Sequence, residues 1–225
     1  MKIDKDCKKT ELIRCEDLSL GYGSKTLFEH LSFSIYKGDY FCIVGENGSG
    51  KTTLMNAIIG IKSPERGKIV LHDSIKENGI GYLAQQKSQQ KDFPASVFEV
   101  VISGCRRKRG FRAFFNDDEK RIACQNMERL GILDLKKHCF SDLSGGQQQR
   151  VLIARTLSAT DEIIMLDEPV TGLDSKTTAD LYKILKELND EGVTVIMISH
   201  DLDAANKYSN RVLELGKGDL RCKSL

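Results

Sequence analysis

The sequence predicts an α/β fold with a mostly parallel sheet, an antiparallel group of strands before it and a helical insert within it. The largely apolar runs Tyr40–Val44, Ile163–Leu166 and Val193–Ile198 are typical of parallel strands that are buried on both faces. Leu31–Ile35 instead alternates apolar and polar residues, as an antiparallel strand with one solvated face does. From Pro94 to about residue 160 the apolar residues recur with a helical period.

Length and composition indicate a globular chain of one domain. It has 225 residues, 40% of them hydrophobic, which is enough for a substantial core. The formal net charge is only +2, so no overall positive charge favours nucleic acid as a partner. No apolar run approaches the roughly 18 to 20 residues of a membrane-spanning helix, and the polar start Met1–Asp6 is unlike a signal peptide. We therefore expect the chain to stay in the cytoplasm.

The seven cysteines form no C-x-x-C pair, and their odd number and wide spacing predict reduced thiols. His138–Cys139 is the one adjacent pair of a histidine and a cysteine, the side chains that zinc prefers. A second pair at the spacing of a zinc site is missing, so we do not expect a structural zinc there.

A phosphate-binding loop is predicted between the strand Tyr40–Val44 and a helix over Thr53–Ile59. The segment fits the pattern G-x-x-x-x-G-K-[ST] at every fixed position; its residues are Gly45, Glu46, Asn47, Gly48, Ser49, Gly50, Lys51 and Thr52. Such a loop presents backbone N–H groups and the positive end of a helix dipole to an anion. Lys51 would supply a charge to the outer phosphates, and Thr52 a hydroxyl to a magnesium ion. The segment predicts a nucleotide site.

Polar side chains follow two other buried strands. Asp167 and Glu168 come directly after Ile163–Leu166, and His200 follows Val193–Ile198. Ligands of open α/β sheets bind at the carboxyl ends of the strands, so these groups are candidates for the same site. There one acidic residue can hold a magnesium shell while the next polarises a water.

Two further segments have open interpretations. Tyr22 stands between two glycines on a predicted loop, where it could stack on a nucleobase or cover the edge of the core. The predicted strand Ile80–Ala84 runs into a glutamine-rich stretch that starts at Gln85. That stretch is either a solvated loop or a source of polar side chains near the phosphate site.

The helical insert holds a second candidate phosphate contact. Ser144 or Asp142 is a natural N-cap for a helix that continues to Leu157, and two glycines expose N–H groups at its positive end. Helical turns are also predicted over 97–101 and 119–130. The basic and aromatic stretch Arg106–Phe115 could be a solvated face, a membrane or partner contact, or an RNA contact.

The remaining strands are expected at the two ends of the chain. Leu12–Leu20 alternates only in part and suggests a strand near an edge of the antiparallel group, and Lys68–Leu71 suggests another short strand. Arg211–Leu215 is expected to be the last strand, followed by a polar tail.

Five motifs in this order resemble the ATP-hydrolysing subunit of an ABC transporter: Gly45–Thr52, Leu143–Gln147, Ile163–Glu168, Gly172–Asp174 and Ser199–His200. The likeness runs from about residue 12 to 218. It implies a P-loop NTPase, RecA-like core with an antiparallel β subdomain and a helical subdomain. The whole chain, 1–225, would be one ABC ATPase domain, with 1–87 and 161–225 as core and β subdomain and 88–160 as helical subdomain.

The resemblance also implies roles for single residues. Tyr22 would stack on adenine, Thr52, Asp167 and Gln85 would surround magnesium, and Thr53 would lie with the phosphate loop. Glu168 would be the general base and His200 a sensor of the γ phosphate, with Gln85 beside them. The signature residues Ser144, Gly145, Gly146 and Gln147 would act on the ATP of a second copy in a head-to-tail dimer, with Asp174 nearby. The segment Val170–Asp174 departs from the commoner alanine-containing form.

The motifs are most similar to the zinc and manganese uptake branch. That likeness implies a membrane permease as partner, an extracytoplasmic metal-binding protein in the same system, no nucleic acid, and a peripheral place on the cytoplasmic face of the membrane. An importer of another solute is an alternative. Two others are a soluble ABC-type ATPase acting on ribosomes or nucleic acid, supported only by Arg106–Phe115, and a nucleotide-binding interaction protein without turnover.

Overall fold

The computed structural model describes residues 9–23, 25–85, 94–105, 114–160, 162–216 and 220–224, and it confirms the predicted α/β fold. Its strands are β1 (Glu11–Tyr22), β2 (Lys25–Tyr36), β3 (Tyr40–Gly45), β4 (Arg66–Leu71), β5 (Gly81–Leu83), β6 (Ile163–Asp167), β7 (Thr194–Ile198), β8 (Arg211–Leu215) and β9 (Leu220–Ser224). Its helices are α1 (Lys51–Ile58), α2 (Asp73–Asn78), α3 (Val97–Ile102), α5 (Asp117–Arg129), α6 (Gly145–Ala159), α7 (Ser175–Asp190) and α8 (Leu202–Tyr208). Short 3-10 turns are η1 (Ser103–Cys105), η2 (Leu133–Leu135) and η3 (Phe140–Asp142).

The strand before the phosphate loop, β3, lies inside a six-stranded sheet of order β5-β6-β7-β3-β8-β9. All neighbouring strands in it are parallel except β8 and β9. The strand expected to be the last is β8, and the expected polar tail is wrong because β9 follows and pairs with it. An edge strand has one neighbour and can have a largely polar sequence, so no apolar run in 220–224 marks it.

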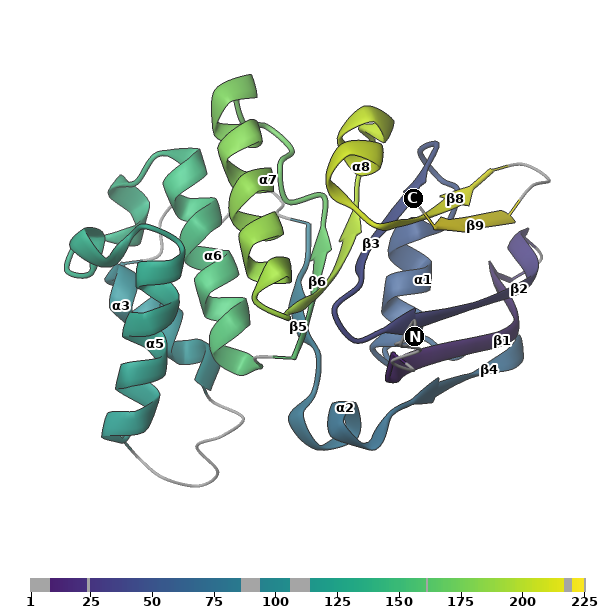
Figure 1. Ribbon diagram of the computed structural model, residues 1–225, viewed down its shortest axis with the longest axis horizontal. Helices are drawn as coiled ribbons and strands as arrows, with labels where there is room; N and C mark the ends of the chain where they lie inside the picture. The colour runs from purple at the N-terminus through teal and green to yellow at the C-terminus, as the bar shows by residue number, and fades with distance from the viewer. Residues whose placement is uncertain are drawn as a thin grey trace, which may run out of the picture.

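Both faces of the parallel sheet are buried, which explains the continuous apolar runs of its central strands. Alternate residues of each strand enter two different cores. Tyr40 and Cys42 of β3 pack in the core formed with α3, α5, α6, α7 and α8. Phe41 and Ile43 pack in the core formed with α1, β1 and β2. Figure 1 shows α1 between the parallel sheet and the three-stranded sheet.

The three-stranded antiparallel sheet has the order β2-β1-β4, so β1 lies at its centre and the expected edge position is wrong. The sequence of β1 alternates only in part because its pairing with β2 shifts register at several points, including between Cys15 and Leu18. A bulge moves the following side chains to the other face, so the period of two is lost even in a central strand.

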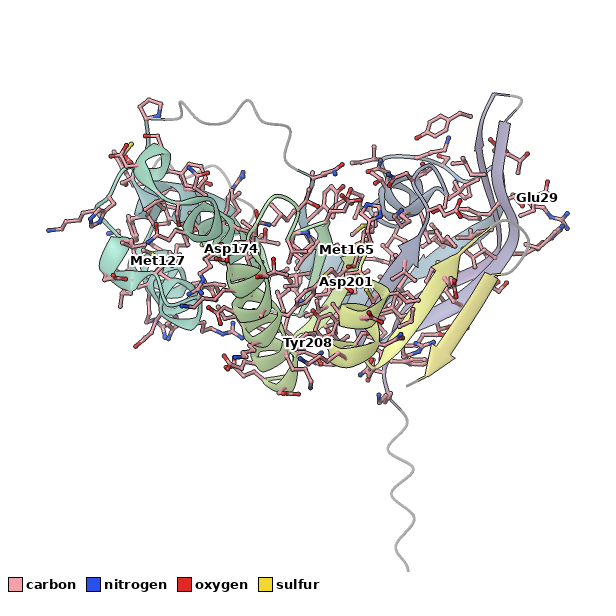
Figure 2. All side chains as sticks on the ribbon, turned by 90° about the horizontal axis from the view of Figure 1, so that it is seen from above. Glu29, Met127, Met165, Asp174, Asp201 and Tyr208 are labelled. Atoms are coloured by element: carbon pink, nitrogen blue, oxygen red, sulfur yellow. The ribbon has the colours of Figure 1, made fainter. Side chains whose placement is uncertain are left out.

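The helical segments α3, α5 and α6 gather at one end of the molecule (Figure 1). Figure 2 shows Met127 of α5 at this end, Glu29 of β2 at the other end and Met165 of the parallel sheet between them. The starts of the three helices are set by capping boxes, in which Ser96 pairs with Glu99, Asn116 with Glu119, and Ser144 with Gln147. Within the described ranges, no helix has the length and apolar character needed to cross a membrane.

Candidate active site

The carboxyl ends of four parallel strands meet at one place. The register pairs Ile43 of β3 with Ile198 of β7, and Ile198 with Asp167 of β6. Leu83 of β5 pairs with Leu166 one residue before that end. The segments that follow β3, β5, β6 and β7 therefore leave the sheet side by side. They carry the phosphate loop, Gln85, the Asp-Glu pair and the histidine that the sequence singles out.

These segments border a pocket of about 510 Å³. Its lining residues are Tyr22, Leu27, Asn47, Gly48, Gly50, Lys51, Thr52, Thr53, Gln85, Glu168 and His200. The fold thus brings Tyr22, much of the phosphate loop and the three predicted catalytic residues around one pocket, while Gly45, Glu46, Ser49 and Asp167 do not line it. The signature residues 144–147 and Asp174 do not border this pocket.

The phosphate loop packs closely on β8. A Cβ at Gly45 would lie 2.2 Å from the carbonyl oxygen of Leu215, and the φ angle of Gly45 is 151°, so only glycine fits. Lys51 folds back over the loop, where its Nζ donates to the carbonyl oxygens of Gly45 at 2.8 Å and Glu46 at 2.9 Å. Burial lowers the pKa of Lys51, and the charges of Glu168 and Asp167 oppose that change. An anion in the loop would favour the charged ammonium in the same way.

Thr52 and Asp167 join the first turn of α1 to the end of β6. The Thr52 hydroxyl donates to Oδ2 of Asp167 at 3.0 Å. Oδ1 of Asp167 is buried and has no hydrogen-bond partner among the described residues. Burial raises the pKa of Asp167, and the hydrogen bond from Thr52 opposes this effect. An orphaned carboxylate oxygen next to a hydroxyl suits a small, hard cation such as Mg²⁺, which binds oxygen and relies on few protein ligands.

Glu168 receives three side-chain contacts. Gln85 Nε2 donates to its Oε2 at 2.8 Å, the Thr171 hydroxyl donates to the same oxygen at 3.2 Å, and His200 Nε2 contacts Oε1. The backbone of Glu168 has φ 52°, which is unusual for a residue other than glycine and is typical of strained functional sites. Of the three side chains expected around magnesium, Thr52 and Asp167 are hydrogen-bonded to each other, whereas Gln85 contacts Glu168.

The position of His200 depends on the residues on either side of it. The Ser199 hydroxyl accepts a hydrogen bond from the backbone N–H of Asp201 at 3.0 Å and lies 3.3 Å from the Tyr182 hydroxyl. Asp201 caps α8 by accepting from the N–H of Ala204 at 2.9 Å. The turn from β7 into α8 is therefore held at both ends, and the imidazole between them is left 43% exposed beside Glu168.

Tyr22 borders the pocket. Its side chain is 57% exposed, and Nζ of Lys62 lies 4.2 Å from the centre of its ring. A ring this open to solvent does not cover the edge of the core. The neighbouring Leu27 also borders the pocket, although the sequence did not single it out. Leu27 belongs to β2, and only the pairing of Tyr22 with Lys25 at the start of that strand brings the segment here.

The signature segment begins α6 as predicted. Ser144 is the N-cap, and its Oγ accepts from the backbone N–H of Gln147 at 3.4 Å. A Cβ at Gly146 would lie 2.3 Å from Cγ2 of Thr177, so this glycine is already needed for contact between α6 and α7. Asp174 caps α7 through Thr177, whose hydrogen bonds lower the pKa of Asp174. Figure 2 shows Asp174 on the side of α7 toward the helical end of the molecule.

Two predictions concern other parts of the sequence, the basic and aromatic stretch Arg106–Phe115 and the pair His138–Cys139. Most of Arg106–Phe115 lies outside the described residues; of its end, Phe114 is 86% exposed and Phe115 packs against a core. In the described part of the chain, no three His, Cys, Asp or Glu side chains are placed to hold a metal ion. The thiol of Cys139 lies 3.1 Å from the Ser141 hydroxyl.

Comparison with known proteins identifies the family and the fold. A sequence model of the ABC transporter family matches residues 28–171. The chain is 34% identical to the zinc uptake system ATP-binding protein ZurA of Listeria innocua, over 92% of this chain and 83% of that protein. It is 32% identical to the manganese transport system ATP-binding protein MntB of Halalkalibacterium halodurans, over 92% of this chain and 83% of that protein.

Solved structures agree with these relatives. One, described as a metal-chelate type ABC transporter in an inward-facing conformation, has a TM-score of 0.86 and 29% identity, covering 96% of this chain and 84% of its own. Another, a dimeric bacterial ABC transporter cassette, has a TM-score of 0.76 and 29% identity, covering 95% and 99%. The sequence, the fold and the pocket at the strand ends thus agree: the chain belongs to the ABC transporter family, as the ATP-binding cassette that hydrolyses ATP to drive transport.

Proposed function

We propose that the pocket at the strand ends is the ATP site and that Glu168 is the general base. The observation that carries this proposal is the meeting of the phosphate loop with Glu168, Gln85 and His200 around one pocket. Tyr22 would stack on the adenine, and residues 45–53 would hold the phosphates. The site would belong to one ATPase domain over 1–225, with 88–160 as its helical subdomain.

Catalysis would rest on position and charge rather than on covalent chemistry. Glu168 would accept a proton from the attacking water, and Lys51 would leave the carbonyl oxygens of Gly45 and Glu46 to neutralise the outer phosphates. His200, which contacts Glu168, would turn to the γ phosphate. Thr52, Asp167 and Gln85 would hold Mg²⁺, which supplies further charge neutralisation when bound.

The site would be completed by a second copy of the chain. Ser144, Gly145, Gly146 and Gln147 lie away from the pocket of their own chain, with Asp174 beside them at the start of α7. In the proposed dimer they face the ATP of the partner copy. The dimeric cassette described above supports dimerisation as such. Capping leaves the hydroxyl hydrogen of Ser144 free to donate, since the oxygen accepts from Gln147.

We also propose that the transported substrate is a divalent metal ion, zinc or manganese. The names of the two relatives support this substrate class, and the metal-chelate type transporter supports it independently. The partners would be a membrane permease and an extracytoplasmic metal-binding protein. The chain would then sit peripherally on the cytoplasmic face of the membrane, and the metal would cross the permease without contacting this subunit.

Glu168→Gln tests the proposed base. This change keeps the shape of the side chain and removes the proton acceptor, so we expect ATP binding to persist, turnover to fall at least about 100-fold, and an ATP-bound dimer to accumulate. Glu29→Gln is the matched control because Glu29 is exposed at the far end of the molecule. Phosphate release and size-exclusion chromatography with ATP measure both effects. Wild-type turnover in Glu168→Gln contradicts the assignment.

Uptake by the assembled transporter tests the substrate class. Membrane vesicles with the permease, the binding protein and this subunit should accumulate radioactive zinc or manganese with ATP, and vesicles with the Glu168→Gln subunit should not. ATP-dependent uptake of an organic solute with no metal uptake would favour another importer. Co-purification with ribosomes in place of a permease would favour the soluble alternative.

A further inference from the structure

Thr171 makes two contacts with the residue proposed as the base. Its hydroxyl donates to Oε2 of Glu168 at 3.2 Å, and its backbone N–H donates to the carbonyl oxygen of Glu168 at 3.2 Å. Residues 168–171 therefore form a four-residue turn. Thr171, at the end of this turn, is bonded to Glu168 at its start through both its backbone and its side chain. Thr171 belongs to the segment in which this chain departs from the commoner alanine-containing form.

The carboxylate of Glu168 needs such support because its backbone position is unusual. With φ 52° the residue lies in the left-handed region, and the backbone bond that holds its N–H to Ile198 is 3.3 Å long. A strained conformation persists only where the surroundings fix it. The other two side chains on this carboxylate, Gln85 and His200, come from different strand ends.

Those two contacts are also ones that the proposed reaction would alter. Gln85 is proposed to move to the metal ion and His200 to the γ phosphate, so both would leave the carboxylate when ATP binds. Thr171 has no such second task, and its place in the same turn as Glu168 lets it stay. A hydroxyl that donates its one hydrogen to Oε2 leaves Oε1 available for the attacking water.

We propose that Thr171 is a positioning residue, whose hydroxyl orients the Glu168 carboxylate for proton transfer during ATP hydrolysis. This inference rests on the proposed role of Glu168 as the base. A purely structural role is a poor explanation for this side chain because Thr171 is exposed and does not belong to either core.

Paired substitutions test the hydroxyl itself. Thr171→Val keeps the shape and removes the donor, and Thr171→Ser keeps the donor and removes the methyl group. We expect Thr171→Val to lower kcat about three- to tenfold with KM for ATP unchanged, as the loss of one hydrogen bond made in the transition state does. Thr171→Ser should recover most of that loss. Thr10→Val is the control, because it removes another exposed hydroxyl in the antiparallel sheet region.

Equal losses in the Val and Ser variants would overturn the inference, because they would show that the loop needs the whole side chain. A raised KM in Thr171→Val with kcat unchanged would overturn it too, since the residue would then act on nucleotide binding. Glu168→Gln serves as the reference. If that variant is inactive while Thr171→Val equals the wild type, the inference fails and the proposed function stands. If Glu168→Gln turns over normally, the proposed base fails first.

A second measurement separates positioning from a role at the dimer interface. In the Glu168→Gln background there is no turnover to influence, so adding Thr171→Val should leave the amount of ATP-bound dimer unchanged in size-exclusion chromatography. A clear loss of dimer in the double variant would place Thr171 at the contact between copies and overturn the inference.

Discussion

Gly146 of the signature helix packs directly against Thr177 of α7. A Cβ at Gly146 would lie 2.3 Å from Cγ2 of Thr177 and 3.7 Å from its Oγ1, so the conflict is with the methyl group alone. The same threonine donates its hydroxyl to Asp174 at 2.6 Å, which fixes its rotamer. The glycine that the sequence suggests for contact with a partner's ATP is therefore also required inside its own chain.

The first prediction follows from this contact. Gly146→Ala should destabilise the chain by about 1–3 kcal/mol, as overpacking of a close contact does. Thr177→Ser removes the methyl group and keeps the hydroxyl, so Gly146→Ala with Thr177→Ser should regain most of the loss. Urea unfolding of both single variants and the double variant measures the coupling. Additive effects, with no recovery, would show that the alanine clashes elsewhere.

Tyr22 provides a second prediction, on nucleotide affinity. Tyr22→Ala should weaken ATP binding roughly 5- to 150-fold, because stacking of a base on an aromatic ring contributes about 1–3 kcal/mol. Tyr22→Phe keeps the ring and is the matched control, since the hydroxyl makes only a 3.5 Å contact with Thr53. Equilibrium binding of a fluorescent ATP analogue measures both. Equal losses in the Ala and Phe variants would argue against stacking.

The third prediction concerns Asp167 and stability. Its folded pKa is raised above the ordinary value of 3.8 by burial, so the protonated form stabilises the fold below about pH 3.8 and this contribution is lost as pH rises through the folded pKa. At pH 8, without metal, the charged carboxylate is unfavourable. The melting temperature of the Asp167→Asn variant should therefore be about 2–4 °C higher than that of the wild type, which is the shift that roughly 1 kcal/mol produces in a domain of this size.

The pH dependence makes this test specific. The advantage of Asp167→Asn should shrink as pH falls through the folded pKa, because the wild-type carboxyl then becomes neutral as well. Asp134→Asn removes an exposed carboxylate and should show no such trend. Thermal unfolding in EDTA from pH 4 to pH 8 follows the difference. An Asp167→Asn variant that melts lower than the wild type at pH 8 would mean that the charge is compensated by other groups.

The fourth prediction concerns alkaline unfolding. Burial raises the pKa of the Cys42 thiol from 9.0 to about 12, with a smaller contribution from the charge of Asp201. Between these values the unfolded thiol releases a proton that the folded thiol keeps, so this group alone should lower the stability by about 1.4 kcal/mol per pH unit. The stabilising contribution of the protonated Cys42 thiol is fully present below pH 9 and is lost as the pH rises toward 12.

Cys42→Ala should accordingly show a shallower decline of the unfolding free energy above pH 9 than the wild type. The variant will be less stable at every pH because a buried sulfur is removed, so the comparison is between slopes. Cys124→Ala, which changes a half-buried thiol in α5, is the control. Identical slopes in Cys42→Ala and the wild type would show that the thiol ionises in the folded chain.

Much of the fold can be predicted from local sequence, and the reason is visible in particular elements. Every residue of β6 and β7 is buried, so both strands appear as apolar runs with one polar residue at an end. Capped helices carry their start signals in a few adjacent residues, as α6 does at Ser144. β9 and the central place of β1 could not be predicted in this way, because strand pairing and bulges depend on residues far apart in the chain.

The sequence by itself determined the phosphate loop, the acidic pair at the end of β6 and the family, because each motif depends on residues within one short segment. Only the tertiary structure decided which side chains meet. Leu27 enters the pocket through the pairing of β1 with β2, and Gln85 and His200 reach Glu168 because β5, β6 and β7 end together. Contacts of this kind join separate segments and carry no local pattern, so the fold must form before they exist.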